Sequence, residues 1–252
     1  MSDARNPGGN ARPVVRETST SRTLHFSAVT IQSRMDLADP DALALKYTRT
    51  MMGFLLLQPA PRLVTMIGLG GGSLAKFCHR YLPAARVEVV EIDAAVIALR
   101  DAFLVPPDGP RFRVIHGDGA QHVRRRATRP DALLVDGFDD EGQPARLCSQ
   151  RFYDHCYSML NTGGVMAVNL HQGDHEYDEH IDRIHRSFHD AVLVIDDDES
   201  SNSVVLACRG PALEAPVRGV ERCIRALDPV AATQLAETFE TVGRAIEERR
   251  NA

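Results

Sequence analysis

The stretch Met66–Phe77, with the sequence MIGLGGGSLAKF, decides the fold. The apolar run Leu63–Ile67 leads into it, and Ser73–Tyr81, with apolar residues at helical spacing, follows it. Three alternate residues between the two are glycine: Gly68, Gly70 and Gly72. Glycine lets the backbone turn sharply and lets a ligand approach the free N–H groups at the start of a helix. We predict a strand, a ligand-binding glycine turn and a helix.

Outward from this turn, β-rich runs alternate with helical segments. The further strands are expected at Arg86–Glu91, Arg111–Ile115, Asp131–Asp136 and Gly164–Leu170. The helices between and after them are expected at Ala94–Ala102, from residue 119 through Arg126, at Ser149–Leu160 and within Tyr177–Phe188. This alternation predicts an α/β fold with a Rossmann-like, mainly parallel sheet and helices on both faces. The last β-rich runs, Ala191–Ile195 and Ser203–Cys208, are close enough to pair as an antiparallel C-terminal hairpin.

The segments that flank this alternating region differ from it in composition. Alternating apolar and polar residues in Arg22–Met35 predict a small N-terminal β element, and helical spacing predicts a helix from about Asp41 to Leu57. The expected organisation is a disordered tail at 1–20, the β element and linking helix at 21–60, a nucleoside-binding domain at 61–210 and amphipathic C-terminal helices at 211–252.

Composition restricts the class of protein. The chain of 252 residues is 44% hydrophobic and 25% charged, as expected for one main domain with a small appendage. A net charge of -5 argues against a duplex nucleic-acid partner, and Arg124–Arg126 is interpreted as an exposed helix end. Five cysteines without a CxxC pair are typical of reduced thiols in a cytosolic protein. No apolar run is long enough to span a membrane, so we predict a cytoplasmic protein without a membrane partner.

Acidic residues follow successive predicted strands. Glu91 and Asp93 end the run VEVVEID, where a carboxylate can accept hydrogen bonds from two ribose hydroxyls. Asp118 and Gly119 follow the next strand, where a carboxylate can accept a hydrogen bond from an adenine amino group. Ligands of open parallel sheets bind at the carboxyl ends of the strands, so these residues predict a nucleoside site. Helix capping and loop solvation remain the alternative roles for these acids.

The identity of the nucleoside depends on the glycine turn and on the fourth strand. The turn lacks the third glycine of the dinucleotide motif GxGxxG, because Leu74 and Ala75 follow Ser73. Asp136 and Asp139 follow the fourth strand, and acids there are unusual for a site that binds NAD. An S-adenosyl nucleoside is therefore favoured over NAD.

Several segments together resemble the spermidine synthase (polyamine aminopropyltransferase) family. They extend from about Leu24 to Cys208 and are IQSRM with Gln32, LALKYTRTM with Tyr47, IGLGGG, VVEID, the triplet GDG, VDGFDDEGQP and LCSQRFYDHCYSML. The resemblance implies an N-terminal β element beside a Rossmann-like domain, a homodimer, and transfer of an aminopropyl group from decarboxylated S-adenosylmethionine to an amine. It also implies that Glu91 holds ribose, that Asp118 and Gly119 hold adenine, that Asp136 and Asp139 face the amine, and that Gln32 and Tyr47 line the pocket.

The amine in such a reaction must lose a proton before it attacks. A carboxylate beside the nitrogen can bind the cation, orient it and receive that proton. Asp136 is the candidate for this catalytic role, and Asp139 is the candidate second anchor of the amine substrate. The reaction needs no metal ion. His171–His185, which is rich in histidine and acids, fits no zinc spacing and is interpreted as a solvated loop and an acidic helix face.

Three positions depart from the family pattern. Gly71 stands where the family carries an aspartate that grips the donor's ammonium group, Arg49 replaces an acid, and DGFDD replaces a DSSDP-type loop. An S-adenosylmethionine-dependent methyltransferase on the same fold, or a catalytically silent nucleoside-binding homologue, therefore stays open beside the aminopropyltransferase.

Overall fold

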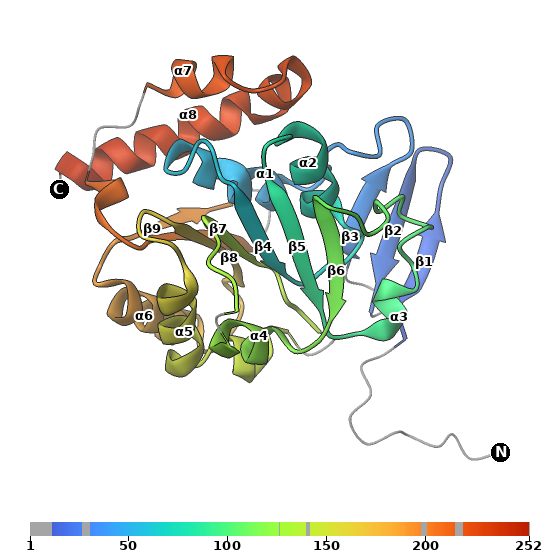
Figure 1. Cartoon of the computed structure of the whole chain (residues 1–252), viewed down its shortest axis with the longest axis horizontal. Coiled ribbons are helices and arrows are strands. Elements are labelled where there is room, and N and C mark those ends of the chain that lie inside the picture. Colours follow the sequence, from blue (N-terminus) through green and yellow to red (C-terminus); the bar gives the residue numbers. More distant parts are fainter. Residues whose placement is uncertain are drawn as a thin grey trace.

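The computed structural model describes residues 12–26, 31–125, 127–139, 142–197, 201–214 and 219–251. A seven-stranded sheet runs through the middle of the molecule in the order β6-β5-β4-β7-β8-β10-β9 (Figure 1). Its strands are β4 (Leu63–Ile67), β5 (Arg86–Glu91), β6 (Phe112–His116), β7 (Ala132–Val135), β8 (Val165–His171), β9 (Val192–Asp196) and β10 (Asn202–Cys208). Neighbours from β6 to β8 pair in parallel, and β10 is antiparallel to both β8 and β9. The predicted Rossmann-like sheet with its antiparallel C-terminal hairpin is confirmed.

The direction of winding changes beside β4. The chain proceeds outward from β4 to β5 and β6, then returns to the other side of β4 for β7 and β8. The carboxyl ends of β4 and β7 therefore border the topological switch point, where open α/β sheets bind their ligands.

Helices cover both faces of this sheet, and the strands are correspondingly apolar. Every residue of β4 and β7 is buried, as expected for parallel strands that are covered on both sides. In Figure 1, α1 (Lys46–Met51), α2 (Ser73–Tyr81), α7 (Val220–Arg225) and α8 (Pro229–Asn251) lie on one side of the sheet, whereas α4 (Gly119–Arg125), α5 (Gln150–Met159) and α6 (Tyr177–Phe188) lie on the other.

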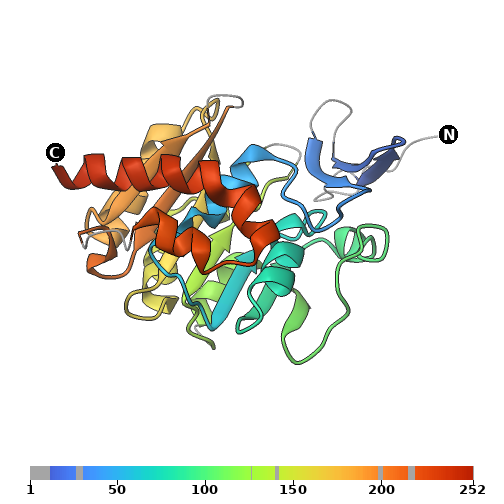
Figure 2. The ribbon, with the colours of Figure 1, turned by 90° about the horizontal axis from the view of Figure 1, so that it is seen from above.

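A separate three-stranded antiparallel sheet precedes the main sheet. It consists of β1 (Val14–Glu17), β2 (Ser21–His25) and β3 (Ile31–Asp36), and Figure 2 shows it standing beside the main body, away from the C-terminal end of α8. The prediction of a tail at 1–20 is therefore wrong from Val14 onward, because β1 pairs along its whole length with β2. Residues 1–11 lie outside the described part of the chain.

Two predicted helices are shorter than expected. The helix expected over Asp41–Leu57 begins only at Lys46 and continues as the 3₁₀ helix η1 (Met52–Leu56). Its expected first turn is held instead by α8, since the Leu43 amide donates to Gln234 Oε1 at 3.0 Å. The helix expected over Ala94–Ala102 ends at Ile97 (α3, Ala94–Ile97). The chain after α3 then makes tertiary contacts, described below, that periodicity does not reveal.

The remaining elements are close to their predicted positions. The other described elements are the 3₁₀ helices η2 (Ala145–Leu147) and η3 (Pro211–Leu213). Among the helices that the structure describes, none combines the length and the apolar character needed to cross a bilayer.

Candidate active site

The predicted site residues are aligned by the register of the parallel sheet. Val90, Ile67 and Val135 are paired across β5, β4 and β7, and Val168 of β8 continues the same row. The next residue of each strand therefore stands at one level, which places Glu91, Gly68, Asp136 and Asn169 side by side at the carboxyl edge. Backbone hydrogen bonds extend the alignment, since the Gly68 amide donates to Val90 and the Asp136 amide donates to Ile67, both over 2.9 Å.

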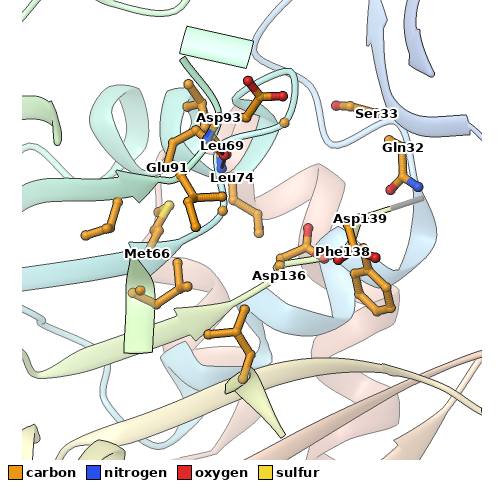
Figure 3. Close-up of a pocket in the computed structure, with 18 of the residues that line it drawn as sticks. Gln32, Ser33, Met66, Leu69, Leu74, Glu91, Asp93, Asp136, Phe138 and Asp139 are labelled. Atoms are coloured by element: carbon orange, nitrogen blue, oxygen red, sulfur yellow. Dashed lines mark hydrogen bonds between the residues drawn. The ribbon is translucent and has the colours of Figure 1, made fainter. Parts of the chain in front are cut away.

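A cavity opens at this edge, between the row and the small N-terminal sheet (Figure 3). Its empty volume is about 1000 Å³, including the part that is open to solvent. The predicted residues that line it are Gln32, Tyr47, Gly68, Gly70, Glu91, Asp93, Gly119, Asp136 and Asp139. The sheet and the N-terminal element thus enclose one shared pocket, as a nucleoside and a second substrate require.

Glycine is required at two points of close backbone approach. Gly68 has φ +97°, and a Cβ there would overlap the Asp136 carbonyl oxygen, so the turn after β4 passes directly against the strand end of β7. A Cβ on Gly119 would overlap Ile67 Cγ2. These two glycines allow the strand tips to converge.

Glu91 connects the second strand to the glycine turn. Its Oε2 accepts a hydrogen bond from the Leu69 amide at 2.8 Å, and its Oε1 accepts one from the Asp93 amide at 2.8 Å. The residue is only 8% exposed, and burial raises the pKa of its carboxyl group while the backbone donors oppose that rise. Each carboxylate oxygen retains further acceptor capacity for a hydroxyl group in the pocket. Glu91 therefore orders the turn and can bind a ligand at the same time.

Asp136 is held from two sides. The Tyr47 hydroxyl donates to its Oδ2 at 3.1 Å, and Asn169 Nδ2 donates to its Oδ1 at 3.0 Å. Burial raises the pKa of the Asp136 carboxyl group, and the two hydrogen bonds lower it by a smaller amount. The pKa of Tyr47 is raised well above its usual value, first by burial and then by the Asp136 charge, so its hydroxyl group stays a donor. A carboxylate with a raised pKa at a pocket wall is suited to receive a proton.

Asp93, Asp118 and Gly72 have local structural roles. Asp93 lines the pocket and also caps α3, since its Oδ1 accepts a hydrogen bond from the Ala95 amide at 2.8 Å. Asp118 Oδ1 accepts a hydrogen bond from the Gln121 amide in the first turn of α4, and its Oδ2 lies 3.6 Å from Arg146 Nε. Gly72 is the left-handed residue before α2. Neither Asp118 nor Gly72 is among the described residues that line the cavity.

Sequence reasoning did not single out several residues at this site. Asn169 is 2% exposed and contacts Asp136 directly. It interrupts the otherwise apolar stretch Val165–Leu170, and a lone amide in a doubly covered strand was a signal that could have been used. Ser33, Phe138 and Arg146 also line the cavity; Ser33 lies in the predicted β element, and Phe138 and Arg146 come from a segment without a periodic pattern.

The position of Gly71 is filled by its neighbours. A Cβ on Gly71 would lie 2.6 Å from Ser33 Oγ and 2.9 Å from Phe103 Cδ1. Phe103 is fixed there, because its carbonyl oxygen accepts a hydrogen bond from the buried Lys76 Nζ at 2.9 Å, and the adjacent Ala102 carbonyl accepts one from Arg22. The side chain missing from Gly71 is therefore replaced by a serine and a phenyl ring from outside the turn, and the donor-gripping carboxylate of the resemblance has no counterpart at this point.

Comparisons with known proteins agree with this architecture. The family model for the spermine/spermidine synthase domain matches residues 44–195. A polyamine aminopropyltransferase from Chromobacterium violaceum is 39% identical over 206 residues, which cover 81% of this chain and 79% of the relative.

Solved structures share the fold at lower identity. Human methyltransferase-like protein 13 in complex with SAH has a TM-score of 0.65 at 21% identity and covers 78% of this chain and 93% of its own. A spermidine synthase in complex with the transition-state analogue AdoDATO has a TM-score of 0.55 at 19% identity and covers 89% of this chain and 88% of its own. Both solved structures share the Rossmann-like sheet, and at these identities they show the fold alone. The family model and the curated relative show the family as well. The chain belongs to the spermine/spermidine synthase family.

Proposed function

We propose that this protein is a polyamine aminopropyltransferase, which transfers an aminopropyl group from decarboxylated S-adenosylmethionine to a small-molecule amine. The proposal depends on the position of Asp136, a carboxylate at the carboxyl edge of the sheet. Asp136 lies at the same level as Glu91 and Gly68 and lines the same pocket. Family membership supports the same class of reaction.

In this proposal the nucleoside part of the donor lies along the β4 and β5 side of the pocket. The acceptor capacity of Glu91 suits the ribose hydroxyls, and the turn Gly68–Gly70 allows close approach of the adenosine to the backbone. Asp118, Gly119 and Asp93 complete the proposed donor site, with Asp118 acting at its rim through the Arg146 pair.

The amine substrate is proposed to lie between Asp136, Asp139, Tyr47 and Gln32, on the β7 side of the pocket. The amine nitrogen attacks the carbon beside the sulfonium. A C–N bond forms, the C–S bond breaks, and the sulfur keeps the electron pair and leaves as a neutral thioether. Asp136 receives the proton that the nitrogen loses, and Asp139 binds the second ammonium group of a diamine.

The charge of the pocket favours the decarboxylated donor. Glu91, Asp93, Asp136 and Asp139 line it, and among the described lining residues Arg146 is the one lysine or arginine. Arg146 is already paired with Asp118. A donor that retained its carboxylate would bring a further negative charge into this field without a free partner of opposite sign.

The proposal is tested with the substitution Asp136→Asn. We expect kcat to fall by about 10²–10⁴-fold with putrescine as acceptor, because the proton acceptor is lost while the shape is kept. Product formation is followed by mass spectrometry of the gained aminopropyl group.

The matched control is Asp131→Asn at the opposite end of β7. Asp131 is also a buried carboxylate with backbone donors, but it accepts hydrogen bonds from the Arg62 and Leu63 amides, away from the pocket. Its substitution should leave kcat near that of the wild type. Unchanged turnover in Asp136→Asn would remove Asp136 as the base, and transfer of a methyl group by the wild type would overturn the aminopropyltransferase.

A further inference from the structure

Both residues that donate to Asp136 are supported from the β9–β10 hairpin, Asn169 directly and Tyr47 through its neighbour Lys46. Behind Asn169, Asn202 Nδ2 donates to Asn169 Oδ1 at 2.8 Å. Directly before Tyr47, Lys46 Nζ lies 3.3 Å from Oδ1 of the buried Asp197, which follows β9. The antiparallel edge of the sheet thus supports the two contacts of the proposed base.

The strand register explains how Asn202 reaches Asn169. Val204 of β10 lies opposite Asn169 of β8. Asn202 is two residues from Val204 and therefore on the same face of the sheet, as the diagonal neighbour of Asn169.

The contact with Asn202 holds the Asn169 amide in the orientation that the Asp136 carboxylate requires. A primary amide has one accepting oxygen and one donating nitrogen. Since Asn202 donates to the oxygen of Asn169, the nitrogen is left to donate to Asp136 Oδ1. The reversed amide would oppose its oxygen to the carboxylate and lose that hydrogen bond in a site where Asn169 is 2% exposed, and it would keep a bond to Asn202 only if the Asn202 amide reversed as well.

We propose that Asn202 is a positioning residue, which fixes the amide of Asn169 so that Asn169 always donates to the catalytic carboxylate of Asp136. This inference rests on the proposed role of Asp136. Asn202 is not among the described residues that line the pocket, and its contact toward the pocket is the one with Asn169.

The consequence concerns the protonation of Asp136. The hydrogen bond from Asn169 lowers the pKa of the Asp136 carboxyl group and works against burial, which raises it. Without Asn202 the Asn169 amide can rotate away, and the effect of burial is then less opposed. The other ionisable groups that line the pocket are Tyr47 of α1, Glu91 and Asp93 at the end of β5, Asp139 in the loop that contains Asp136, and Arg146 of η2.

The test compares Asn202→Ala and Asn202→Leu, which is close to Asn in size and carries no charge, with the wild type. Both remove the donor to Asn169 Oδ1, so kcat should fall about tenfold, while the affinity for methylthioadenosine is unchanged. The acid limb of the pH profile of kcat/KM should move to higher pH. The same titration is read without catalysis from the carboxyl ¹³C signal of Asp136, which is assigned by its absence in Asp136→Asn.

The matched control is Asn161→Ala. Asn161 Nδ2 donates to Asp131 Oδ1 at 2.8 Å, so the same kind of pair is broken at the other end of β7. This variant should lose stability without a change in the acid limb or in the Asp136 signal.

An Asp136 titration that is the same in the wild type and in the Asn202 variants would overturn the proposal, even if kcat fell. If Asn202→Ala does not fold, Asn202→Leu, which keeps the size of the side chain without adding a charge, gives the decisive measurement. If the wild type transfers no aminopropyl group, the proposed function fails, whereas the NMR titration still decides whether Asn202 controls Asp136.

Discussion

Individual residues at this site stabilise the local fold and also line the pocket. Glu91 holds the Leu69 amide in the glycine turn, and Asp93 caps α3, yet both carboxylates face the pocket. These two acids therefore have capping or turn-ordering contacts and also face the pocket, where a ligand could reach them. Only the coordinates show that these two roles are compatible, because a sequence does not reveal which lone pairs remain available.

Gly71 provides a prediction at the residue scale. We expect Gly71→Asp to destabilise the protein by about 1–3 kcal/mol, because the added Cβ would overlap Ser33 Oγ and Phe103 and force both to move. Chemical denaturation measures the loss. Gly109→Asp is the control, since a Cβ at Gly109 has no neighbour within 4 Å, and it should change the stability by less than about 0.5 kcal/mol. Equal losses for the two variants would contradict the crowding at Gly71.

At the scale of elements, periodicity predicted strands and long helices well. The apolar run of β4 has its predicted bounds, and those of β7 and β8 differ from the prediction by one residue at each end, because both faces of each strand are covered. The failures lie where tertiary contacts replace local preference. Gln234 of α8 holds Leu43 out of a helix, and Lys76 of α2 fixes Phe103 beyond the early end of α3. Contacts across 191 and 27 residues cannot be found from a local pattern.

The buried Lys76 provides a prediction for helix α2. It is 1% exposed, and burial lowers its pKa to about 8. The unfolded chain then binds more protons than the folded chain between pH 8 and the usual lysine range, so the free energy of unfolding rises with pH in that window. We expect the stability of Lys76→Met relative to wild type to decrease by roughly 2 kcal/mol from pH 7.5 to 10.

Urea denaturation at several pH values measures this difference. Arg80→Met, at an exposed position one turn further along α2, is the control and should differ from wild type by a constant amount. A constant difference for Lys76→Met as well would show that Lys76 does not titrate in this range.

For the whole molecule, the sequence predicted which edge of the sheet carries the site but not how the pocket is closed. The order of the acids placed Glu91 and Asp136 at the carboxyl edge, and the register confirms that they stand level. Asn169 and Ser33 were missed because their roles depend on packing between the main sheet and other layers. The small N-terminal sheet supplies one wall, and its contact with the glycine turn has no signature in either segment alone.

The whole fold should respond to the nucleoside. At methylthioadenosine concentrations of 100 times Kd, we expect about 2.7 kcal/mol of stabilisation, or roughly 5–10 °C in Tm. Glu91→Gln should reduce this protection, since the amide nitrogen cannot accept a hydrogen bond from ribose. Asp139→Asn, on the proposed amine side, should retain this protection.

Scanning calorimetry provides the measurement. In the same experiment, the decarboxylated donor should protect the protein more than intact S-adenosylmethionine does at equal concentration. Equal protection of wild type and Glu91→Gln would place the ribose elsewhere.

The level ends of β4, β5 and β7 also determine where the protein can change its length. Adding one residue inside any of these strands would turn each later side chain of that strand to the opposite face of the sheet. It would also shift the carboxyl end of that strand relative to its neighbours. An added residue before the amino-terminal end of a strand, for example in the loop around Pro130 that precedes β7, leaves the aligned row at the pocket undisturbed. In a library selected for activity, insertions and deletions should therefore accumulate at the amino-terminal edge of the sheet, opposite the pocket.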